Sequence, residues 1–222
     1  MIFSSIFDRI VKIIFYLRVK ALGKLIGKTI AITLASVIGA LLIAFGAAAL
    51  FAPRLVADMF DDMGAYSASI HFYERNFEST KTTDDLVLLI DKIDIKQSPE
   101  QAEKYLNKFI SSPDFLSKCT ALDREGHLIP MREYFLGLKA QALMLGDKGE
   151  KAIDFCKQTV AEIGYGEFNP FRAIVSSIGD ELSSSQLQNI KEEILSVAAN
   201  LTSEQLVFAN ADVQDINKLI QG

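Results

Sequence analysis

Apolar residues along this chain follow two patterns, one continuous and one periodic. Residues 29–51 read TIAITLASVIGALLIAFGAAALF, a run of 23 residues without a charge. As a helix this run is about 34 Å long, which is enough to cross a hydrocarbon core of about 30 Å. The continuous pattern therefore predicts one transmembrane helix, over residues 29–52, and an integral membrane protein with a single span.

The segment before the span, residues 1–28, combines an apolar stripe with basic side chains. The stripe recurs at helical spacing and consists of Phe3, Phe7, Ile10, Ile14, Leu17, Ala21 and Leu25. The basic residues are Arg9, Lys12, Arg18, Lys20, Lys24 and Lys28. This combination is typical of a helix that lies in the headgroup layer of an anionic leaflet. We expect a basic amphipathic cytoplasmic arm with residues 2–27 in the membrane plane, or else a basic stub that only orients the span.

Charge is divided by the span. The six basic residues before Thr29 face a single acidic residue, Asp8, which gives this segment +5. Because the whole chain carries −5, the part from Thr29 onward carries −10. Basic flanks stay cytoplasmic, so we expect the N-terminus inside and residues 53–222 outside, at the inner membrane of a bacterial cell. The acidic domain also argues against nucleic acid as a partner.

A cleaved signal peptide is the alternative to a permanent span. Ala47 and Ala49 supply an A-x-A pattern for cleavage. However, 28 residues precede the apolar run, and the run exceeds the 7–15 residues typical of a signal peptide. The lengths favour the span.

Small residues recur along the predicted span. One face, at four-residue steps, carries Ser36, Ala40, Ala44 and Ala48, and Gly39 stands in a neighbouring row. Small side chains allow two membrane helices to approach closely. We therefore expect a packing face that joins this helix to another membrane protein or to a second copy; the alternative is that Ala and Gly are simply common in spans.

The periodic pattern begins after Pro53 and predicts one helix after another. The expected helices cover residues 64–79, 83–96, 99–111, 114–122, 130–145, 149–163, 170–179, 184–200 and 203–220. Thr83, Ser98-Pro99 and Asn169-Pro170 mark helix starts, and Gly146 and Gly164 mark helix ends. The fold class predicted for residues 53–222 is therefore all-α.

One helix pair resembles a tetratricopeptide unit. Residues 135–160 read FLGLKAQALMLGDKGEKAIDFCKQTV, in which Leu138 and Ala142 match packing positions of the first helix and Gly146-Asp147 the turn. The second helix is matched by Ala152, Phe155 and Thr159. A weaker copy runs from Asp84 to Pro113. The sequence departs from the repeat pattern at Lys139, where a small residue is usual, and it lacks the bulky Trp.

The resemblance implies a solenoid of α-helical hairpins that stack to bury a continuous core and leave a groove. The last two helices, polar at Ser183–Ser185 and from Asn210 to Asp215, are expected to cap the stack. A compact, non-repeating helical bundle is the alternative. The architecture is similar to single-span bacterial proteins whose tetratricopeptide-like outer domains accompany translocation machinery, an analogy of architecture only.

Catalytic and metal-binding patterns are absent from the sequence. There is no glycine-rich phosphate loop, HExxH or GxSxG. The histidines are His71, expected on a helix as a boundary residue and not a catalyst, and His127, expected in a solvated loop. Cys119 and Cys156 are interpreted as buried small hydrophobic residues, although a disulfide outside the cytoplasm is permitted. We expect no cofactor, metal or catalytic residue.

The acidic pairs near residues 84–94 and the aromatic loop at residues 165–171 can each be interpreted in more than one way. Asp84-Asp85 suits a helix start, and Asp91 with Asp94 suits a solvated face better than a metal pair. The segment Tyr165–Phe171 places aromatic residues in a loop, where they contact a peptide or, as we prefer, pack back on the helices.

The expected function is that of a binding module. A lipid bilayer holds the span, and the outer domain binds a protein or peptide partner as a scaffold or accessory subunit of a membrane or secretion assembly. The alternatives are a structural protein that self-associates through its span and, less favoured, an enzyme with scattered acidic residues.

Overall fold

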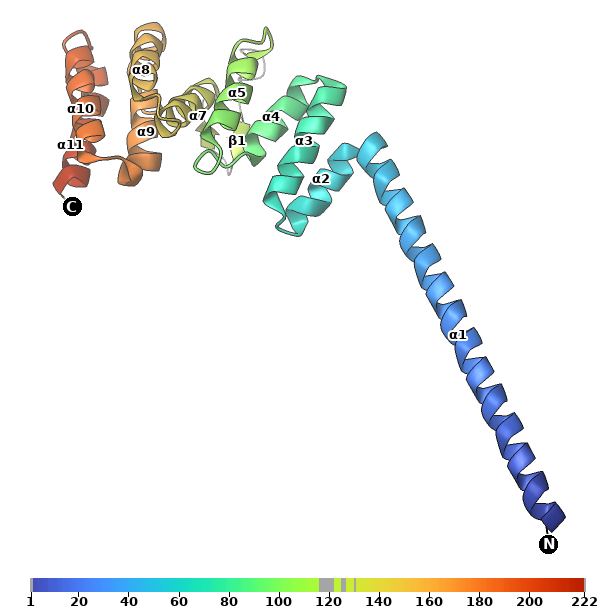
Figure 1. The fold of residues 1–222 in the computed structure, drawn as a ribbon. Coiled ribbons are helices and arrows are strands. Elements are labelled where there is room, and N and C mark those ends of the chain that lie inside the picture. Colours follow the sequence, from blue (N-terminus) through green and yellow to red (C-terminus); the bar gives the residue numbers. More distant parts are fainter. Residues whose placement is uncertain (1, 116–121, 125–126, 130, 222) are drawn as a thin grey trace. The chain divides into compact units, whose positions relative to one another are not determined.

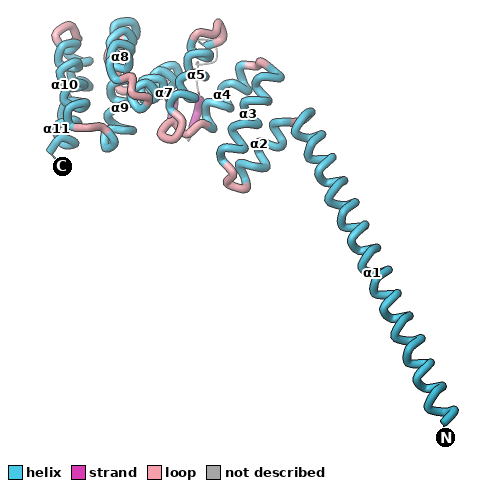
Figure 2. Tube along the Cα trace, in the orientation of Figure 1, coloured by secondary structure: helices cyan, strands magenta, loops and turns pink. Residues whose placement is uncertain are grey.

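The structure of the chain is a computed structural model. It describes the backbone of residues 2–115, 122–124, 127–129 and 131–221, and the side chains of residues 26–115 and 131–221. Helices dominate the described backbone, so the predicted helical class is confirmed (Figures 1 and 2). The chain divides into two compact units, Met1–Phe72 and Tyr73–Gly222, with the boundary inside one helix.

The first unit begins with one long helix, α1, over Ile2–Phe51. The predicted boundary between arm and span near Lys28 is not a break, because the helix is continuous for 50 residues, or about 75 Å. Within α1, the segment Ile26–Phe51 is long and apolar enough to cross a membrane, with a mean hydropathy of 2.4 in a window that is not buried by the rest of the chain. An in-plane position of residues 2–27 would require a bend, and it stays a prediction.

A short break at Ala52 separates α1 from α2, Pro53–Asp62. Pro53 occupies the first turn of α2, where its missing N–H would have no helical partner in any case. At the other end Gly64 adopts a φ of 71°, and the N–H of Ala65 donates to the carbonyl of Phe60 at 2.8 Å. This left-handed ending turns the chain into α3, Tyr66–Thr80.

The second unit continues with short helices joined by short loops. Its elements after α3 are α4 (Thr83–Lys92), α5 (Pro99–Ile110), β1 (Leu122–Arg124), β2 (His127–Ile129), α7 (Met131–Leu145), α8 (Gly149–Ile163), α9 (Pro170–Ile178), the 3-10 turn η1 (Gly179–Glu181), α10 (Ser184–Ala198) and α11 (Ser203–Gln221). The helices predicted from periodicity from residue 131 onward agree with these bounds to within two residues.

The end of α4 differs from the predicted one for a local reason. Helix α4 begins at Thr83, as predicted, and the hydroxyl of Thr82 caps it by accepting the N–H of Asp85. It ends at Lys92 instead of residue 96, because the Asp94 carboxylate accepts the N–H of Lys96 at 2.9 Å and stabilises a turn.

Helix α5 begins at Ser98-Pro99, as predicted, with Ser98 at the N-cap and Pro99 in the first turn. The Ser98 side chain, however, makes no capping hydrogen bond. The Gln101 amide donates instead to Glu74 of α3 at 2.8 Å, and Tyr105 donates to the same oxygen at 2.7 Å. A tertiary contact to α3 has replaced the local cap.

The strand pair corrects a helix prediction. Leu122 lies in β1 and pairs with Ile129, and Arg124 pairs with His127 in an antiparallel hairpin. The expected helix over 114–122 therefore does not include Leu122, and His127 lies in a strand and not in a loop. Residues 116–121, with Cys119, lie outside the described residues. Strands of three residues are too short to give the alternating pattern that identifies a strand in sequence.

Packing in the second unit joins consecutive helices and more distant ones. Helix α7 packs most extensively on α9, α5 and α8, and α10 packs on α11, while smaller contacts join α9 with α11 and α8 with α10. A continuous core of buried side chains follows these contacts; its largest fully buried members from α8 onward are Tyr165, Phe171, Ile174, Ile178, Ile190, Ile194 and Ile216. Each amphipathic helix thus buries its apolar face against more than one neighbour.

Gly137 allows the closest approach, between α7 and α9. A Cβ built at this position would lie 2.7 Å from the Cβ of Ala173, a separation that packed carbon atoms do not tolerate. Neither atom belongs to a flexible side-chain end, so only movement of a helix would relieve the overlap.

We predict that Gly137→Ala destabilises the second unit by roughly 1–2 kcal/mol, because overpacking of about 1–3 kcal/mol exceeds the helix-propensity gain of up to about 1 kcal/mol. Chemical denaturation followed by circular dichroism measures the change. The matched control is Gly149→Ala, where the added Cβ would meet only the flexible Met144 sulfur at 3.6 Å. Equal stability of Gly137→Ala and the natural protein would contradict the packing account.

Candidate functional site

The exposed aromatic side chains of the second unit gather at one hollow. Among its described residues, the exposed large hydrophobic side chains are Tyr134, Phe168, Leu195 and Val207. Both aromatic ones, 36% and 42% exposed, line a hollow of about 320 Å³ between α7, α9 and the loop before α9. We call it the aromatic hollow. Its other lining residues are Glu133, Gly137, Leu138, Gln141, Glu167, Asn169, Arg172, Ala173, Ser176 and Ser177.

Buried aromatic side chains on either side of Phe168 fix the loop that carries it. Gly164 ends α8 with a φ of 87°, and the chain then buries the Tyr165 ring, which stacks on Phe171 with 6.3 Å between centroids. The predicted packing of this loop against the helices is therefore confirmed for Tyr165 and Phe171. Phe168 is different, because it remains exposed between these two buried anchors.

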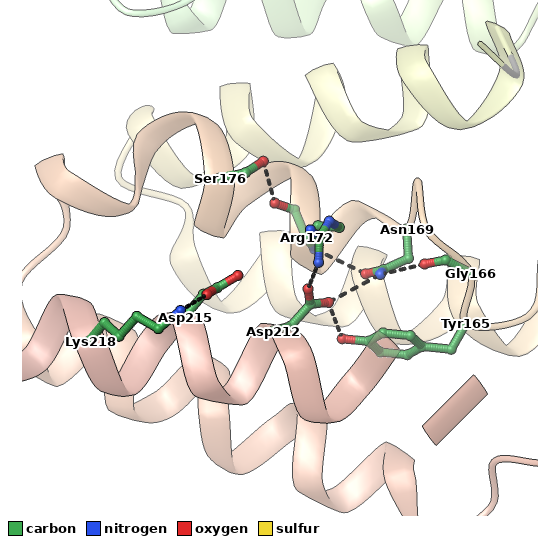
Figure 3. A network of polar contacts seen from close by, with 8 residues as sticks. All are labelled: Tyr165, Gly166, Asn169, Arg172, Ser176, Asp212, Asp215 and Lys218. Carbon is green, nitrogen blue, oxygen red and sulfur yellow. Dashed lines mark hydrogen bonds and ion pairs between the residues drawn. The ribbon is translucent and has the colours of Figure 1, made fainter. Parts of the chain in front are cut away.

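Asp212 of α11 is the centre of the polar network beneath the aromatic hollow (Figure 3). Its carboxylate is 1% exposed and accepts from Tyr165 at 2.8 Å, from Asn169 at 3.2 Å and from Arg172 at 2.8 Å. Asn169 also caps α9, as predicted, by accepting the N–H of Arg172 at 3.0 Å, and its amide donates to the Gly166 carbonyl. One carboxylate thus fixes the loop, the start of α9 and the Arg172 guanidinium.

The electrostatics of this network favour a fixed arrangement. Burial, reinforced by the neighbouring carboxylate of Asp212, raises the pKa of Tyr165 well above its usual value. The phenol therefore stays protonated at physiological pH and donates continuously. Arg172 is a cation at all relevant pH values and neutralises the buried carboxylate. The network holds Arg172 at the wall of the hollow.

The contents of the aromatic hollow suit recognition of a side chain. Two exposed rings offer apolar contact, and Arg172, Glu133 and Glu167 surround them with charge of both signs. Tyr134 packs edge-on against the buried Phe135, with 5.3 Å between centroids, so its ring is supported from beneath. A few rigid aromatic side chains within a polar rim form the usual core of a protein-binding surface.

Three further hollows, of about 410, 490 and 650 Å³, are larger, but their lining offers fewer groups suited to binding a partner. The one of 490 Å³ surrounds the polar start of α8 at Lys148 and Gly149, and the one of 650 Å³ lies beside Asn200 and Gln205. The one of 410 Å³ contains a salt bridge between Arg132 and Glu162. None of them presents an exposed aromatic ring among the described residues.

The residues predicted to act in the membrane are found on α1. Ser36, Ala40 and Ala44 are exposed, whereas Gly39 and Ala48 are partly covered. Lys28 is exposed, and the side chains of Arg9, Lys12, Arg18, Lys20 and Lys24 lie outside the described residues. The span packing face and the basic membrane-surface face both stay predictions.

The cysteine, histidine and acidic residues singled out in the sequence make structural contacts where the structure describes them. Cys156 is fully buried without a disulfide, as predicted, and burial raises the pKa of its thiol. His71 is exposed and lies edge-on to Phe72 with 5.4 Å between centroids. Asp85 accepts the hydroxyls of Thr80 and Thr82 at the start of α4. The described side chains contain no group of three or more His, Cys, Asp or Glu placed to hold a metal ion.

Asp212 is the important residue that the sequence analysis missed. The segment from Asn210 to Asp215 was interpreted as a polar cap, yet the buried positions of α11 are Ala209, Asp212 and Ile216. These positions follow helical spacing, so an acidic residue on the apolar stripe was visible in the sequence. Such a residue indicates a buried partner, although the partner itself cannot be read from the pattern.

Comparison of the chain with protein-family models, with curated proteins and with solved structures gives no match in any of the three.

We predict that Asp212→Ala destabilises the second unit by roughly 2–4 kcal/mol, because it leaves buried donors of Tyr165 and Asn169 unpaired while water still reaches Arg172. The control is Asp215→Ala in the same helix, which removes an exposed pair with Lys218 and should change stability by less than about 0.5 kcal/mol. Urea denaturation of both variants measures the difference. Similar values for the two would refute the role given to Asp212.

Proposed function

We propose that the protein is a membrane-anchored binding module. The segment Ile26–Phe51 holds it in the bilayer, and the second unit binds a protein or peptide partner at the aromatic hollow. The observation that carries this proposal is the convergence of the two exposed aromatic rings of the second unit, Tyr134 and Phe168, at a single hollow. They come from different elements, so their meeting is a product of the fold.

A tetratricopeptide-like stack is the arrangement we propose for the second unit. Contacts of α7 with α9 and of α9 with α11 support it, because stacked hairpins place first helices beside first helices. The contact of α5, the second helix of the weaker copy, with α7 joins that copy to the next hairpin. Lys139, which departs from the repeat pattern, extends over the ring of Phe155 with 4.4 Å to the centroid. A cation–π contact between α7 and α8 there takes the place of close packing by a small residue.

The partner we propose presents one large apolar or aromatic side chain to the hollow. A volume of about 320 Å³ admits a single such side chain and excludes a folded element. Arg172 and the carboxylates of Glu133 and Glu167 then contact polar groups on either side of it. Because Asp212 fixes Arg172 before binding, little conformational entropy is lost at that residue when the partner arrives.

The orientation we propose places the N-terminus in the cytoplasm and the second unit outside, at the inner membrane of a bacterial cell. The basic residues before the span and the acidic chain after it support this direction. There the protein would act as a scaffold or accessory subunit of a membrane or secretion assembly. No cofactor, metal or nucleic acid is part of the proposal.

Self-association through the span is the second candidate. Ser36, Ala40 and Ala44 form a face of small residues that the rest of the chain leaves exposed. A second copy packed on this face would make the protein a structural element of the membrane surface. This candidate predicts contacts between copies that are independent of the aromatic hollow.

The test is photo-crosslinking in cells from a benzophenone amino acid placed at Ser176, on the wall of the hollow. We predict a crosslinked partner that becomes at least about fivefold weaker in Tyr134→Ala and Phe168→Ala, since removing a central aromatic contact weakens binding by more than about 1 kcal/mol. The control Leu195→Ala removes an exposed apolar side chain of α10 and should leave the crosslink unchanged.

Two outcomes would count against this function. A crosslink that does not respond to either aromatic substitution would remove the hollow from the binding surface. A crosslink only to a second copy would favour the structural candidate.

A further inference from the structure

Helix α2 leaves an apolar edge uncovered immediately after the apolar helix. Leu55, Met59 and Met63 recur every four residues and are 68%, 42% and 61% exposed. The last residues of α1, Leu50 and Phe51, are also exposed, at 60% and 87%. A single residue, Ala52, separates the two helices, so exposed apolar side chains occur at the end of α1 and again from Leu55 of α2 onward.

Around its axis α2 has three distinct arcs. At about 100° per residue, Leu55, Met59 and Met63 share an arc roughly 80° wide. The neighbouring arc holds the buried side chains Pro53, Val56 and Ala57, together with the partly covered Phe60. The third arc is polar and contains Arg54, Asp58, Asp61 and Asp62. The apolar part of the helix is therefore wider than the part that the protein buries.

Aromatic contacts show where α2 lies along α1. The Phe60 ring stacks on Phe72 of α3 with 5.6 Å between centroids. Both rings meet Phe45 of α1 edge-on, at 6.1 and 6.5 Å. Phe45 precedes the end of α1 by six residues, or about 9 Å along the axis. Helix α2 consequently turns back beside the last turns of α1 and reaches the level of Phe45.

We propose that α2 lies in the membrane interface at the C-terminal end of the span, with Leu55, Met59 and Met63 in contact with lipid acyl chains. This inference rests on the proposed anchoring of Ile26–Phe51 in a bilayer. If the last turns of α1 are in lipid, a helix packed beside Phe45 is at the same depth. Its exposed apolar edge then meets the boundary between headgroups and acyl chains, and its acidic arc faces water.

Lipid is the occupant that the geometry favours over a protein. The uncovered edge begins close to the end of the apolar segment, where Leu50 and Phe51 are exposed as well. The polar arc adjoins this edge and carries Arg54 with three carboxylates, so contact of the apolar side chains with acyl chains, and not attraction of basic side chains to anionic lipid, would hold the helix in the interface. The consequence is a membrane contact formed by α2 in addition to the span.

The absence of tryptophan from the chain provides a direct test. A single Trp is introduced into the full-length protein at Leu55 or at Met59, and each variant is reconstituted in phosphatidylcholine vesicles with and without bromine on the acyl chains. Bromine quenches a Trp that touches it. Leu42→Trp, in the middle of the apolar segment, reports whether that segment is inserted at all. Val207→Trp on α11 is the matched control, because Val207 is 65% exposed and Leu55 is 68% exposed.

The expected result is strong quenching at Leu42, clear quenching at Leu55 and Met59, and no loss of fluorescence at Val207. Quenching at Leu42 without any at Leu55 or Met59 would overturn the interfacial position of α2 while leaving the anchor intact. Blue-shifted, unquenched emission at Leu55 and Met59 would assign the edge to a protein instead. Absence of quenching at Leu42 would overturn both the anchor and the inference that rests on it.

Discussion

The structure depends first on the need to remove the side chains of Ile26–Phe51 from water. This helix is apolar around its whole circumference, and its most apolar window is not buried by the rest of the chain. In a bilayer each Leu, Ile, Val or Phe near the centre contributes about −0.3 to −0.6 kcal/mol, and the backbone polar groups are satisfied within the helix. In water the same surface would drive aggregation. The helix is long and apolar enough to cross a membrane, and the insertion proposed above would remove this surface from water.

The second unit solves a different problem, since its helices are short and amphipathic. None of them buries its apolar face alone. Helix α5 packs on α4 and α7, α7 on α5, α8 and α9, and α11 on α9 and α10, so each has more than one partner. Helices α7 and α9 approach so closely at Gly137 that no side chain larger than hydrogen fits there.

Asp212 constrains the second unit in a different way. A buried carboxylate is tolerated only when its oxygens accept hydrogen bonds. Tyr165, Asn169 and Arg172 donate three such bonds to Asp212. The same bonds hold the wall of the aromatic hollow in place.

Much of the fold could be predicted from the sequence, because helical periodicity and end signals are local. The bounds of α7, α8, α9, α10 and α11 were predicted to within two residues, and the Asn169 cap of α9 was correct. The errors have both local and tertiary causes. The turn at Asp94 ends α4 early, and the three-residue strands β1 and β2 are too short to show an alternating pattern. At the start of α5 the cause is tertiary, because Gln101 donates to Glu74 of α3. The aromatic hollow was not predictable, since it requires Tyr134 and Phe168 to meet across two elements; the exposed edge of α2 depends equally on which residues α2 buries.

The most direct measurement of the central claim is alkaline carbonate extraction of cell membranes that contain the full-length protein, with fractions compared by mass. An inserted helix resists this wash, because its apolar side chains and not its charges hold it in the bilayer. The account predicts that the complete 222-residue chain stays in the membrane pellet with an integral control protein. Release of the full-length chain into the supernatant, or recovery of a chain shortened by cleavage near Ala49, would contradict it.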